Sequence, residues 1–416
     1  MTELACRFCS APLQHVFVDL GMSPLANSYR DPAARLEPEV YYPLCTYVCG
    51  ECFLVQLPEV QTPEQIFRDY AYFSSYSESW LRHSERYVEA MIDRFGFGAE
   101  HQVVEVASND GYLLQYFQRR GVPVLGIEPA ENVAAAAREL GIETLTEFFG
   151  TDLARRLVAE GRQADLLLGN NVFAHTPALN DFAAGLPILL APHGVVTLEF
   201  PHLQRLIERN QFDTIYHEHY SYFSFTVARR VLAQHGLTVF DVEELPTHGG
   251  SLRIYARHAD VDLDAAAGLV VTDAVDALLE REHALGLSDV ATYTAFGERV
   301  KATKRRLLDF LIRTRESSQT VVGYGAPAKG NTMLVYCGIG PDMLDFTVDR
   351  SPHKQGKLLP GSQIPILAPD AIRDARPDVV LILPWNLRDE IIDQMADIRS
   401  WGGRFAVAVP EMEVIA

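Results

Sequence analysis

Two blocks of alternating short apolar strands and helices constrain the fold of this chain most strongly. The strands of the first block are expected at residues 103–106, 124–127, 165–168 and 194–199, with helices at 80–95, 112–120 and 132–140. The strands of the second block are expected at 321–322, 346–349, 379–383 and 405–409. Such alternation is typical of a mostly parallel sheet covered by helices on both faces, so the fold class is α/β. Residues 239–243 and 252–256 are expected to form a β-hairpin that closes the first block.

The length of 416 residues exceeds one ordinary hydrophobic core and indicates several domains. We expect a zinc-binding domain at 1–75, a Rossmann-like cofactor domain at 76–262, two long connecting helices within 263–318, and a Rossmann-like C-terminal domain at 319–416.

The net charge of −19, from 55 acidic and 36 basic residues, argues against nucleic-acid binding. Since no apolar run approaches the ~20 residues that span a bilayer, we expect a cytoplasmic protein without membrane association. Nothing demands a dimer, and a monomer is expected.

Four of the six cysteines form two CxxC pairs, Cys6/Cys9 and Cys49/Cys52. Two such pairs can complete a tetrahedral Zn²⁺ site with no open coordination position, which indicates a structural metal. The 39 residues between the pairs are expected to contain a β-hairpin, and Cys45 is a possible substitute ligand. A redox CxxC is the alternative, but no βαβ pattern surrounds either pair.

The strand at 103–106 ends in a turn of small and polar residues that would let the backbone approach a ligand closely. Glu128, at the end of the next strand, can accept hydrogen bonds from both hydroxyls of a ribose. The turn lacks the GxGxxG spacing of a pyrophosphate site, and Asp110 would repel phosphate, so we expect S-adenosylmethionine rather than a dinucleotide. A purely structural turn is the alternative. The candidate cofactor residues are Glu105, Ala107, Ser108, Asn109, Asp110, Gly111, Glu128 and Asn171, with His175 nearby in the sequence.

Residues 216–220, Tyr-His-Glu-His-Tyr, concentrate side chains that transfer protons. Two histidines and a carboxylate can supply a base, a group that orients it and a further donor. His248, in the turn 248–251, adds another donor. The alternative is a polar loop with solvated histidines.

The segment 323–330 fits the dinucleotide pattern GxGxxA, with Asp349 about 20 residues later, and taken alone it indicates NAD. The basic residues that follow favour a sugar-nucleotide diphosphate instead. A vestigial loop with a solvated basic stretch is the third possibility. The aromatic segment 70–80 would line a ligand cleft or pack between domains. The candidate substrate residues are Tyr72, Tyr76, Tyr324, Lys329, Arg350, His353 and Lys354.

Across nearly its whole length the chain resembles the S-adenosylmethionine-dependent C-methyltransferases that act on nucleotide-linked 4-keto-deoxysugars. The motifs that carry the resemblance are the paired CxxC, Glu105–Gly111, Phe212–His219, Pro246–Gly250, Gly323–Lys329 and Pro352–Gln355. Ala107 departs from the family turn, which usually carries glycine. The resemblance implies a zinc-bearing N-terminal domain, a central cofactor domain and a C-terminal domain that helps hold the nucleotide sugar.

By the same resemblance His219 is the catalytic base, with Glu218 beside it. A carbon next to a ketone is acidic because its carbanion delocalises onto oxygen, so a neutral imidazole can deprotonate it near pH 7. Tyr216, Tyr222 or His248 could donate to the enolate oxygen. C3′ is the expected methylation position; C5′ and the identity of the nucleotide stay open. The alternatives are an NAD-dependent oxidoreductase or epimerase that uses the Gly323 loop, and a zinc-stabilised nucleotide-binding regulator.

Overall fold

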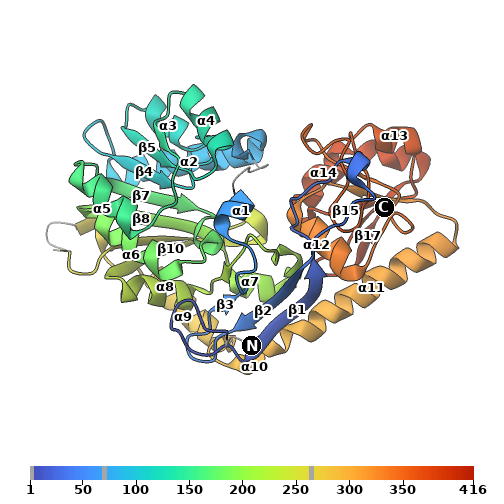
Figure 1. Ribbon diagram of the computed structural model, residues 1–416, viewed down its shortest axis with the longest axis horizontal. Coiled ribbons are helices and arrows are strands. Elements are labelled where there is room, and N and C mark those ends of the chain that lie inside the picture. The colour runs from blue at the N-terminus through green and yellow to red at the C-terminus, as the bar shows by residue number, and fades with distance from the viewer. Residues whose placement is uncertain (1–3, 68–72, 262–266) are drawn as a thin grey trace. The chain divides into compact units, whose positions relative to one another are not determined.

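The computed structural model describes residues 4–67, 73–261 and 267–416, and the chain divides into two units (Figure 1). Unit 1 consists of Met1–Leu13, Cys49–Leu203 and Glu218–Ser288. Unit 2 consists of Gln14–Val48, Gln204–His217 and Asp289–Ala416. Each unit therefore draws on three separate stretches of the sequence. The bounds of the four domains expected from the sequence stay predictions.

Unit 1 contains a seven-stranded sheet in the order β10-β11-β8-β7-β4-β5-β6. Its strands are β4 (Val103–Val106), β5 (Val124–Ile127), β6 (Thr144–Leu145), β7 (Ala164–Asn170), β8 (Leu190–Pro201), β10 (Leu237–Leu245) and β11 (Ser251–His258). The pairs from β6 to β8 are parallel, and β11 lies antiparallel between β8 and β10. Figure 1 shows β5, β4, β7 and β8 side by side in this order. The mostly parallel sheet and the closing hairpin are confirmed.

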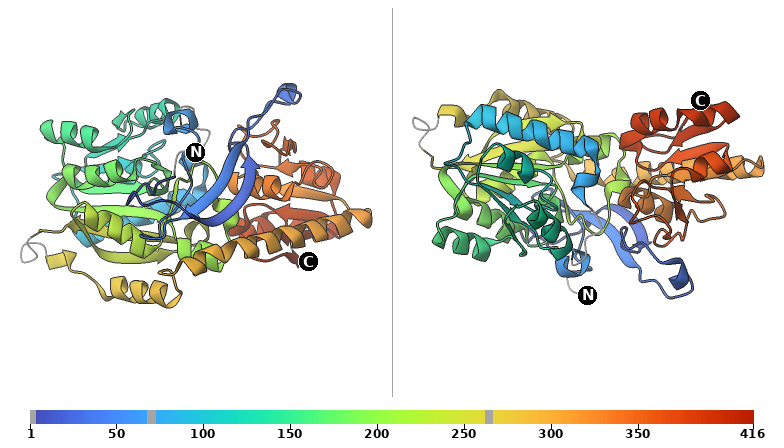
Figure 2. Two further views of the ribbon diagram at one scale, coloured as in Figure 1. Left: turned by 60° about the horizontal axis from the view of Figure 1, so that its bottom comes forward. Right: turned by 90° about the horizontal axis from the view of Figure 1, so that it is seen from above.

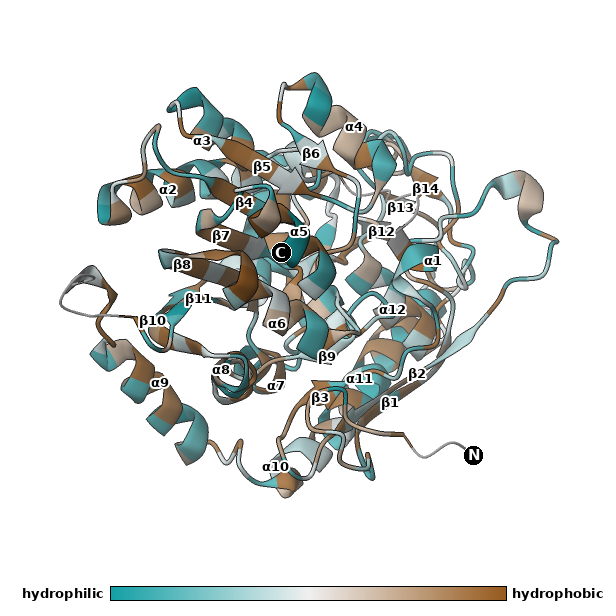
Figure 3. Ribbon diagram, turned by 60° about the vertical axis from the view of Figure 1, so that its left-hand side comes forward, coloured by the Kyte–Doolittle hydropathy of each residue, from teal (hydrophilic) through white to brown (hydrophobic). Residues whose placement is uncertain are grey.

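Helices cover both faces of this sheet. Strand β4 illustrates the alternation, since Val103 packs into one core and Val104 and Val106 into the other. The first core includes side chains from α2 (Glu78–Phe95), α3 (Leu114–Arg119) and α4 (Glu131–Glu139). The second includes side chains from α5 (Thr151–Ala159), α6 (Leu179–Leu189), α8 (Phe225–Gln234) and α9 (Asp273–Ala284). Figure 3 shows the hydrophobic residues concentrated along the central strands.

Helix α2 has the start and stop signals that its sequence predicts. The Ser77 hydroxyl accepts a hydrogen bond from the backbone N–H of Trp80, and Gly96 ends the helix in the left-handed conformation, with φ 72°. The buried side chains Trp80, Tyr87 and Met91 recur at helical spacing and face the sheet. The helix predicted at 80–95 is confirmed.

Two short strands of unit 1 lie outside the large sheet. β3 (Val55–Gln56) pairs antiparallel with β9 (Ser221–Tyr222), with Val55 opposite Tyr222 and Gln56 opposite Ser221. The short helix α1 (Pro63–Phe67) follows β3. These strands connect the cysteine-bearing segment to the residues that follow His219.

Unit 2 begins with an antiparallel hairpin of β1 (His15–Ser23) and β2 (Tyr42–Val48), whose strands run side by side in Figure 2. The hairpin expected between the CxxC pairs is confirmed. The Phe17 ring stacks on Phe296 with centroids 4.7 Å apart. Phe296 begins the long helix α11 (Phe296–Glu316), which follows α10 (Val290–Thr294). Helix α7 (Leu203–Glu208) lies at the boundary of the two units in the sequence.

The rest of unit 2 is a second α/β sheet in the order β14-β13-β12-β15-β16-β17. All pairs are parallel except β16–β17, so the second α/β block is confirmed. Its strands are β12 (Val321–Tyr324), β13 (Thr347–Val348), β14 (Ile366–Leu367), β15 (Val379–Ile382), β16 (Arg404–Val407) and β17 (Glu413–Ile415). Its helices are α12 (Ala328–Cys337), α13 (Ala371–Ala375) and α14 (Arg388–Gln394).

None of the helices in the described part of the chain combines the length and the apolar character needed to cross a membrane.

Candidate active site

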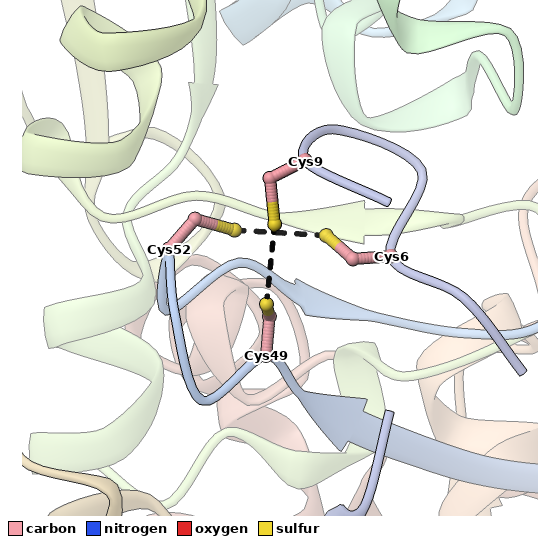
Figure 4. Close-up of side chains that lie close together, drawn as sticks. All are labelled: Cys6, Cys9, Cys49 and Cys52. Atoms are coloured by element: carbon pink, nitrogen blue, oxygen red, sulfur yellow. Dashed lines mark hydrogen bonds between the residues drawn. The ribbon is translucent and has the colours of Figure 1, made fainter. Parts of the chain in front are cut away.

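The four cysteines of the CxxC pairs point their sulfur atoms toward one another (Figure 4). Their Sγ atoms all lie within 4.8 Å, with 3.6 Å between Cys6 and Cys52 and 3.5 Å between Cys9 and Cys49. Tetrahedral zinc with Zn–S bonds of 2.3 Å places its sulfurs about 3.8 Å apart, so the cluster fits Zn²⁺. Cys45 is not part of the cluster.

Hydrogen bonds in the cluster favour a thiolate at Cys6, whereas burial raises the pKa of Cys9 to about 11, and the hydrogen bond with Cys6 together with burial raises the pKa of Cys52. The hydrogen bond with the Cys52 thiol, followed by backbone N–H groups and Gln56, lowers the pKa of Cys6 to about 4, although burial opposes this. The Gln56 side-chain amide donates to Cys6 Sγ at 3.1 Å and accepts the backbone N–H of Arg7 at 2.9 Å. Such a second layer of hydrogen bonds is common around metal ligands. With all four positions of a tetrahedral ion taken by sulfur, the role of the zinc is structural.

The predicted cofactor turn follows β4 and is built on left-handed backbone. Ala107, Asn109 and Gly111 have φ of 58°, 49° and 75°. A Cβ at Gly111 would lie 2.5 Å from Ile142 Cδ1, and this contact together with the φ of 75° favours glycine there. The Asn109 side-chain oxygen accepts the backbone N–H of Ser74 at 2.9 Å, which ties the turn to the residues before α2.

Two buried carboxyl groups face this turn. Both oxygens of Glu128 accept backbone N–H groups, from Asn109 at 3.0 Å and Ala130 at 2.9 Å. Burial raises the pKa of Glu128 to about 7. Burial also raises the pKa of Glu105 well above its ordinary value, and the charges of Asp110 and Glu128 act in the same direction. A bound cation would favour the ionised form of these groups.

Several buried polar atoms at the carboxyl ends of β4 and β7 have no hydrogen-bond partner among the described residues. Among them are Ser108 Oγ, Asp110 Oδ1 and Asn171 Oδ1. Buried polar groups are nearly always paired in folded proteins, so these atoms suit a ligand that brings hydroxyl and amino donors. S-adenosylmethionine carries both kinds of donor. The individual contacts of the eight candidate cofactor residues stay predictions.

His219 lies among aromatic rings of unit 1. Its ring centroid is 4.8 Å from that of His175 and 6.1 Å from that of Tyr222. Burial, and then the neighbouring His219, lowers the pKa of His175 well below its ordinary value. A neutral His175 leaves one of the two imidazoles available to take a proton without a second positive charge beside it. His175 is thereby added to the candidate proton-transfer group.

The rest of the 216–220 segment is also largely buried. Glu218 and His217 are buried and Tyr216 is half-buried. His217 belongs to unit 2, where its Nε2 lies 3.3 Å from the Pro43 carbonyl oxygen and burial lowers its pKa. These positions contradict a solvated polar loop.

Glu199 and its partners form a buried ionic network next to the turn that carries His248, and the sequence analysis did not predict it. The carboxylate of Glu199, at the end of β8, contacts His83 Nε2 at 2.9 Å and Arg253 at 3.0 Å, and it accepts the Thr247 hydroxyl at 3.0 Å. The hydrogen bond with His83 and the charge of Arg253 hold the pKa of Glu199 below its ordinary value, although burial opposes them. The network therefore anchors the turn that carries His248.

The ring of Trp80 lies between this network and the cofactor turn. It stacks on His83 with centroids 4.8 Å apart and lies 6.1 Å from Tyr112 and 5.2 Å from His248. His248 has φ 52°, and its Nε2 is 3.4 Å from Asn171 Nδ2. His248 is thus placed next to a candidate cofactor residue, which its sequence position did not reveal.

The glycine loop of unit 2 has the expected strand–turn–helix geometry. Gly325 has φ 90°, and a Cβ there would lie 2.5 Å from Pro384. Asp349 accepts the backbone N–H of Ala326 at 2.8 Å. Lys329 donates to Asn386 Oδ1 at 2.9 Å, and burial lowers its pKa while the charge of Asp213 opposes this.

The remaining substrate candidates of unit 2 are spread around this loop. Lys354 donates to the Ala326 carbonyl at 3.0 Å, and the Tyr324 hydroxyl to Gln394 at 3.3 Å. Arg350 is 3.8 Å from Glu390, and His353 is exposed. Tyr76, in unit 1, is 61% exposed, and Tyr72 lies outside the described residues. Their roles in substrate binding stay predictions.

Three family models match the chain in succession. They are described as "Putative zinc binding domain" at residues 6–67, "Methyltransferase domain" at 80–242 and "C-methyltransferase C-terminal domain" at 246–410. A curated relative, the C-methyltransferase NovU of Streptomyces niveus, is 36% identical over 414 residues, which cover 99% of this chain and 96% of that protein.

Solved structures match about half of the chain. Magnesium protoporphyrin IX methyltransferase (ChlM) of Synechocystis PCC 6803 with S-adenosylhomocysteine is 16% identical and covers 42% of this chain and 82% of its own, with a TM-score of 0.34. The PH0226 protein of Pyrococcus horikoshii OT3 is also 16% identical and covers 47% and 97%, with a TM-score of 0.37.

Proposed function

Because the chain belongs to the S-adenosylmethionine-dependent C-methyltransferases, we propose that it methylates C3′ of a nucleotide-linked 4-keto-6-deoxyhexose in deoxysugar biosynthesis. The observation that supports this most is the grouping of His219, His175 and Tyr222, three proton-handling rings beside a sheet of the cofactor-binding kind. Methylation of carbon requires a carbanion, and a ketone supplies one by enolisation. A base and an oxyanion donor are therefore the groups that such a site needs.

His219 is assigned as the base that takes the proton from C3′. Neutral imidazole is its reactive form, and the neutral state of His175 beside it avoids repulsion of the imidazolium that forms. Glu218 is assigned to stabilise that imidazolium. Tyr216, Tyr222 and His248 are the candidate donors to the enolate oxygen at C4′. S-adenosylmethionine supplies the methyl group, which C3′ takes as the S–CH₃ bond breaks and S-adenosylhomocysteine leaves.

The cofactor is assigned to the Ala107–Gly111 turn, with Glu128 as the acceptor for the ribose hydroxyls. The raised pKa of Glu105 and Glu128 supports a site for a positively charged ligand, since a cation restores their ionised form. The C-terminal glycine loop, with Lys329 and Lys354, is assigned to the nucleotide diphosphate. The match of residues 246–410 to a C-methyltransferase domain favours this reading of the loop over an NAD-dependent oxidoreductase or epimerase.

Proton exchange tests the base separately from methyl transfer. With S-adenosylhomocysteine and a nucleotide 4-keto-6-deoxyhexose in D₂O, the wild-type protein should exchange the C3′ proton, as followed by NMR. His219→Gln should slow both this exchange and kcat by about 10²- to 10⁴-fold, the usual contribution of a general base.

Two outcomes would count against the proposal. Exchange and methylation at C5′, which also adjoins the ketone, would move the reaction to the other carbon. A loss below tenfold in His219→Gln, with substrate binding intact, would remove His219 as the base. Calorimetric titration separates the two candidate functions. Binding of S-adenosylmethionine without binding of NAD supports the methyltransferase, and the reverse result supports the oxidoreductase.

A further inference from the structure

We infer that Arg7, inside the first cysteine knuckle, is a positioning residue that holds the 218–222 segment and through it the imidazole of His219. This inference rests on the proposed role of His219 as the base. It assigns the zinc-bearing part of unit 1 a task in catalysis besides stabilising the fold. The contacts that carry it all lie within unit 1.

The Arg7 guanidinium joins the two strands of the small β3–β9 pair. One of its nitrogens donates to the carbonyl of Leu57, directly after β3. The other terminal nitrogen is 3.5 Å from the Ser221 hydroxyl in β9, and the guanidinium carbon lies 5.4 Å from the centre of the Tyr220 ring. A planar guanidinium can make these contacts at once, whereas the compact ammonium of lysine cannot.

The cysteine cluster fixes the backbone of Arg7. Arg7 lies between Cys6 and Cys9, and its N–H donates to Gln56, which itself donates to Cys6 Sγ. The Arg7 carbonyl accepts the side-chain amide of Asn180, from α6, at 3.1 Å. Because the backbone of Arg7 is held in place, its guanidinium has a fixed position next to β9.

The 218–222 segment depends on these neighbours because it forms little regular structure of its own. Tyr220 is held at its backbone from both sides: its carbonyl accepts the N–H of Leu57 at 3.0 Å, and its N–H donates to the Ala174 carbonyl at 2.8 Å. Its hydroxyl donates to the Gln61 carbonyl at 2.9 Å. Ala174 directly precedes His175, and Tyr220 directly follows His219. A shift of Tyr220 therefore changes the position of His219 relative to His175.

Arg7→Met removes the donors and keeps an apolar stem of similar length. We expect kcat to fall about 10- to 100-fold, because a misplacement of about 1 Å in a catalytic group can have an effect of that size. The KM for S-adenosylmethionine, the affinity for S-adenosylhomocysteine and the zinc content should not change. Hydrogen exchange should become faster at the amides of Leu57 and Tyr220. Arg7→Lys should recover part of kcat.

Arg230→Met is the matched control, because exposed Arg230 contacts the second knuckle through the Glu51 carbonyl at 3.5 Å. It should change neither kcat nor exchange at Tyr220. Unchanged kcat and exchange in Arg7→Met would overturn the inference, and so would a loss of kcat explained by loss of zinc. If Arg7→Met exchanges faster at Tyr220 while His219→Gln keeps full activity, Arg7 still holds the segment and His219 is not the base.

Discussion

Ala107 occupies a position where the backbone favours glycine. Its φ of 58° places the Cβ close to the following carbonyl, which costs an L-residue roughly 1–2 kcal/mol. The Ala107 N–H donates to the Ile127 carbonyl at 2.7 Å, so the turn cannot relax without losing a contact between β4 and β5. The resemblance noted in the sequence has glycine at this point. The chain therefore keeps a strained residue in its candidate cofactor turn.

Ala107→Gly should stabilise unit 1 by about 1 kcal/mol, or about 2–4 °C in its melting temperature, because it relieves this strain. Ala135→Gly, in the middle of α4 with ordinary helical geometry, is the control and should destabilise by about 1 kcal/mol. Thermal unfolding followed by circular dichroism measures both. Equal effects of the two substitutions would show that the left-handed conformation of Ala107 carries no strain.

How well single residues could be predicted from the sequence depended on whether their signal was local. The zinc cysteines were found because each pair has a fixed short spacing, and the cluster is confirmed. Glu199, by contrast, binds His83 and Arg253, which are 116 and 54 residues away in the sequence. No local sequence pattern predicts partners at such distances. Arg7 was missed for the same reason. The catalytic assignments stay predictions.

At the scale of elements, the 3₁₀ turn Phe212–Thr214 is anchored to the second α/β sheet of unit 2. The wholly buried carboxylate of Asp213 accepts the Trp385 indole N–H at 2.7 Å, and Lys329 contributes a nearby charge. Burial raises the pKa of Asp213 from its ordinary 3.8 to about 6. Ionisation of Asp213 thus weakens the folded state above about pH 6, and this cost disappears as the pH falls toward 4.

Trp385→Phe should destabilise unit 2 by about 1–3 kcal/mol at pH 8, where it leaves an ionised buried carboxylate without its indole donor. The loss should be smaller at pH 5, where Asp213 is mostly protonated. Trp401→Phe is the control, because the Trp401 indole donates to an uncharged acceptor, the Pro377 carbonyl, at 3.1 Å. Urea unfolding at the two pH values measures both variants. A pH-independent loss in Trp385→Phe would contradict the raised pKa.

Strands were easier to predict than some helices. Short apolar runs such as 103–106 and 124–127 are observed as predicted, because each is buried on both faces. Helix α6 has a weaker signal, since it contains Gly185 and Pro187. A Cβ at Gly185 would lie 3.0 Å from the Phe149 ring and 3.1 Å from Gly150, so close packing against the start of α5 favours glycine within the helix. Tertiary contact overrides helix propensity there.

At the scale of the whole molecule, the zinc cluster is part of a larger core. Cys6, Cys49 and Cys52 are buried in the same hydrophobic cluster as side chains of α5, α6 and α8. The metal site is therefore continuous with one face of the large sheet in unit 1. Loss of the metal should therefore lower the stability of unit 1 as a whole and not only that of the two CxxC segments.

Removal of zinc with a chelator, or Cys49→Ser, should lower the melting temperature of unit 1 by about 10 °C or more, because metal binding free energy becomes folding free energy. Unit 2 should melt as before. Scanning calorimetry, with hydrogen exchange to assign each transition, tests this. An unchanged unit 1 transition after complete removal of zinc would contradict a structural role.

The interleaving of the two units has a consequence for how the protein is made. Residues 14–48 belong to unit 2, and their strand β1 contacts α10, α11 and α12, which all lie after residue 289. During synthesis the contacts of this early hairpin with those helices can form only after α10, α11 and α12 have left the ribosome. A gene cut between residues 288 and 289 would therefore yield a first fragment with all of unit 1 and two segments of unit 2, and a second fragment with only the remainder of unit 2.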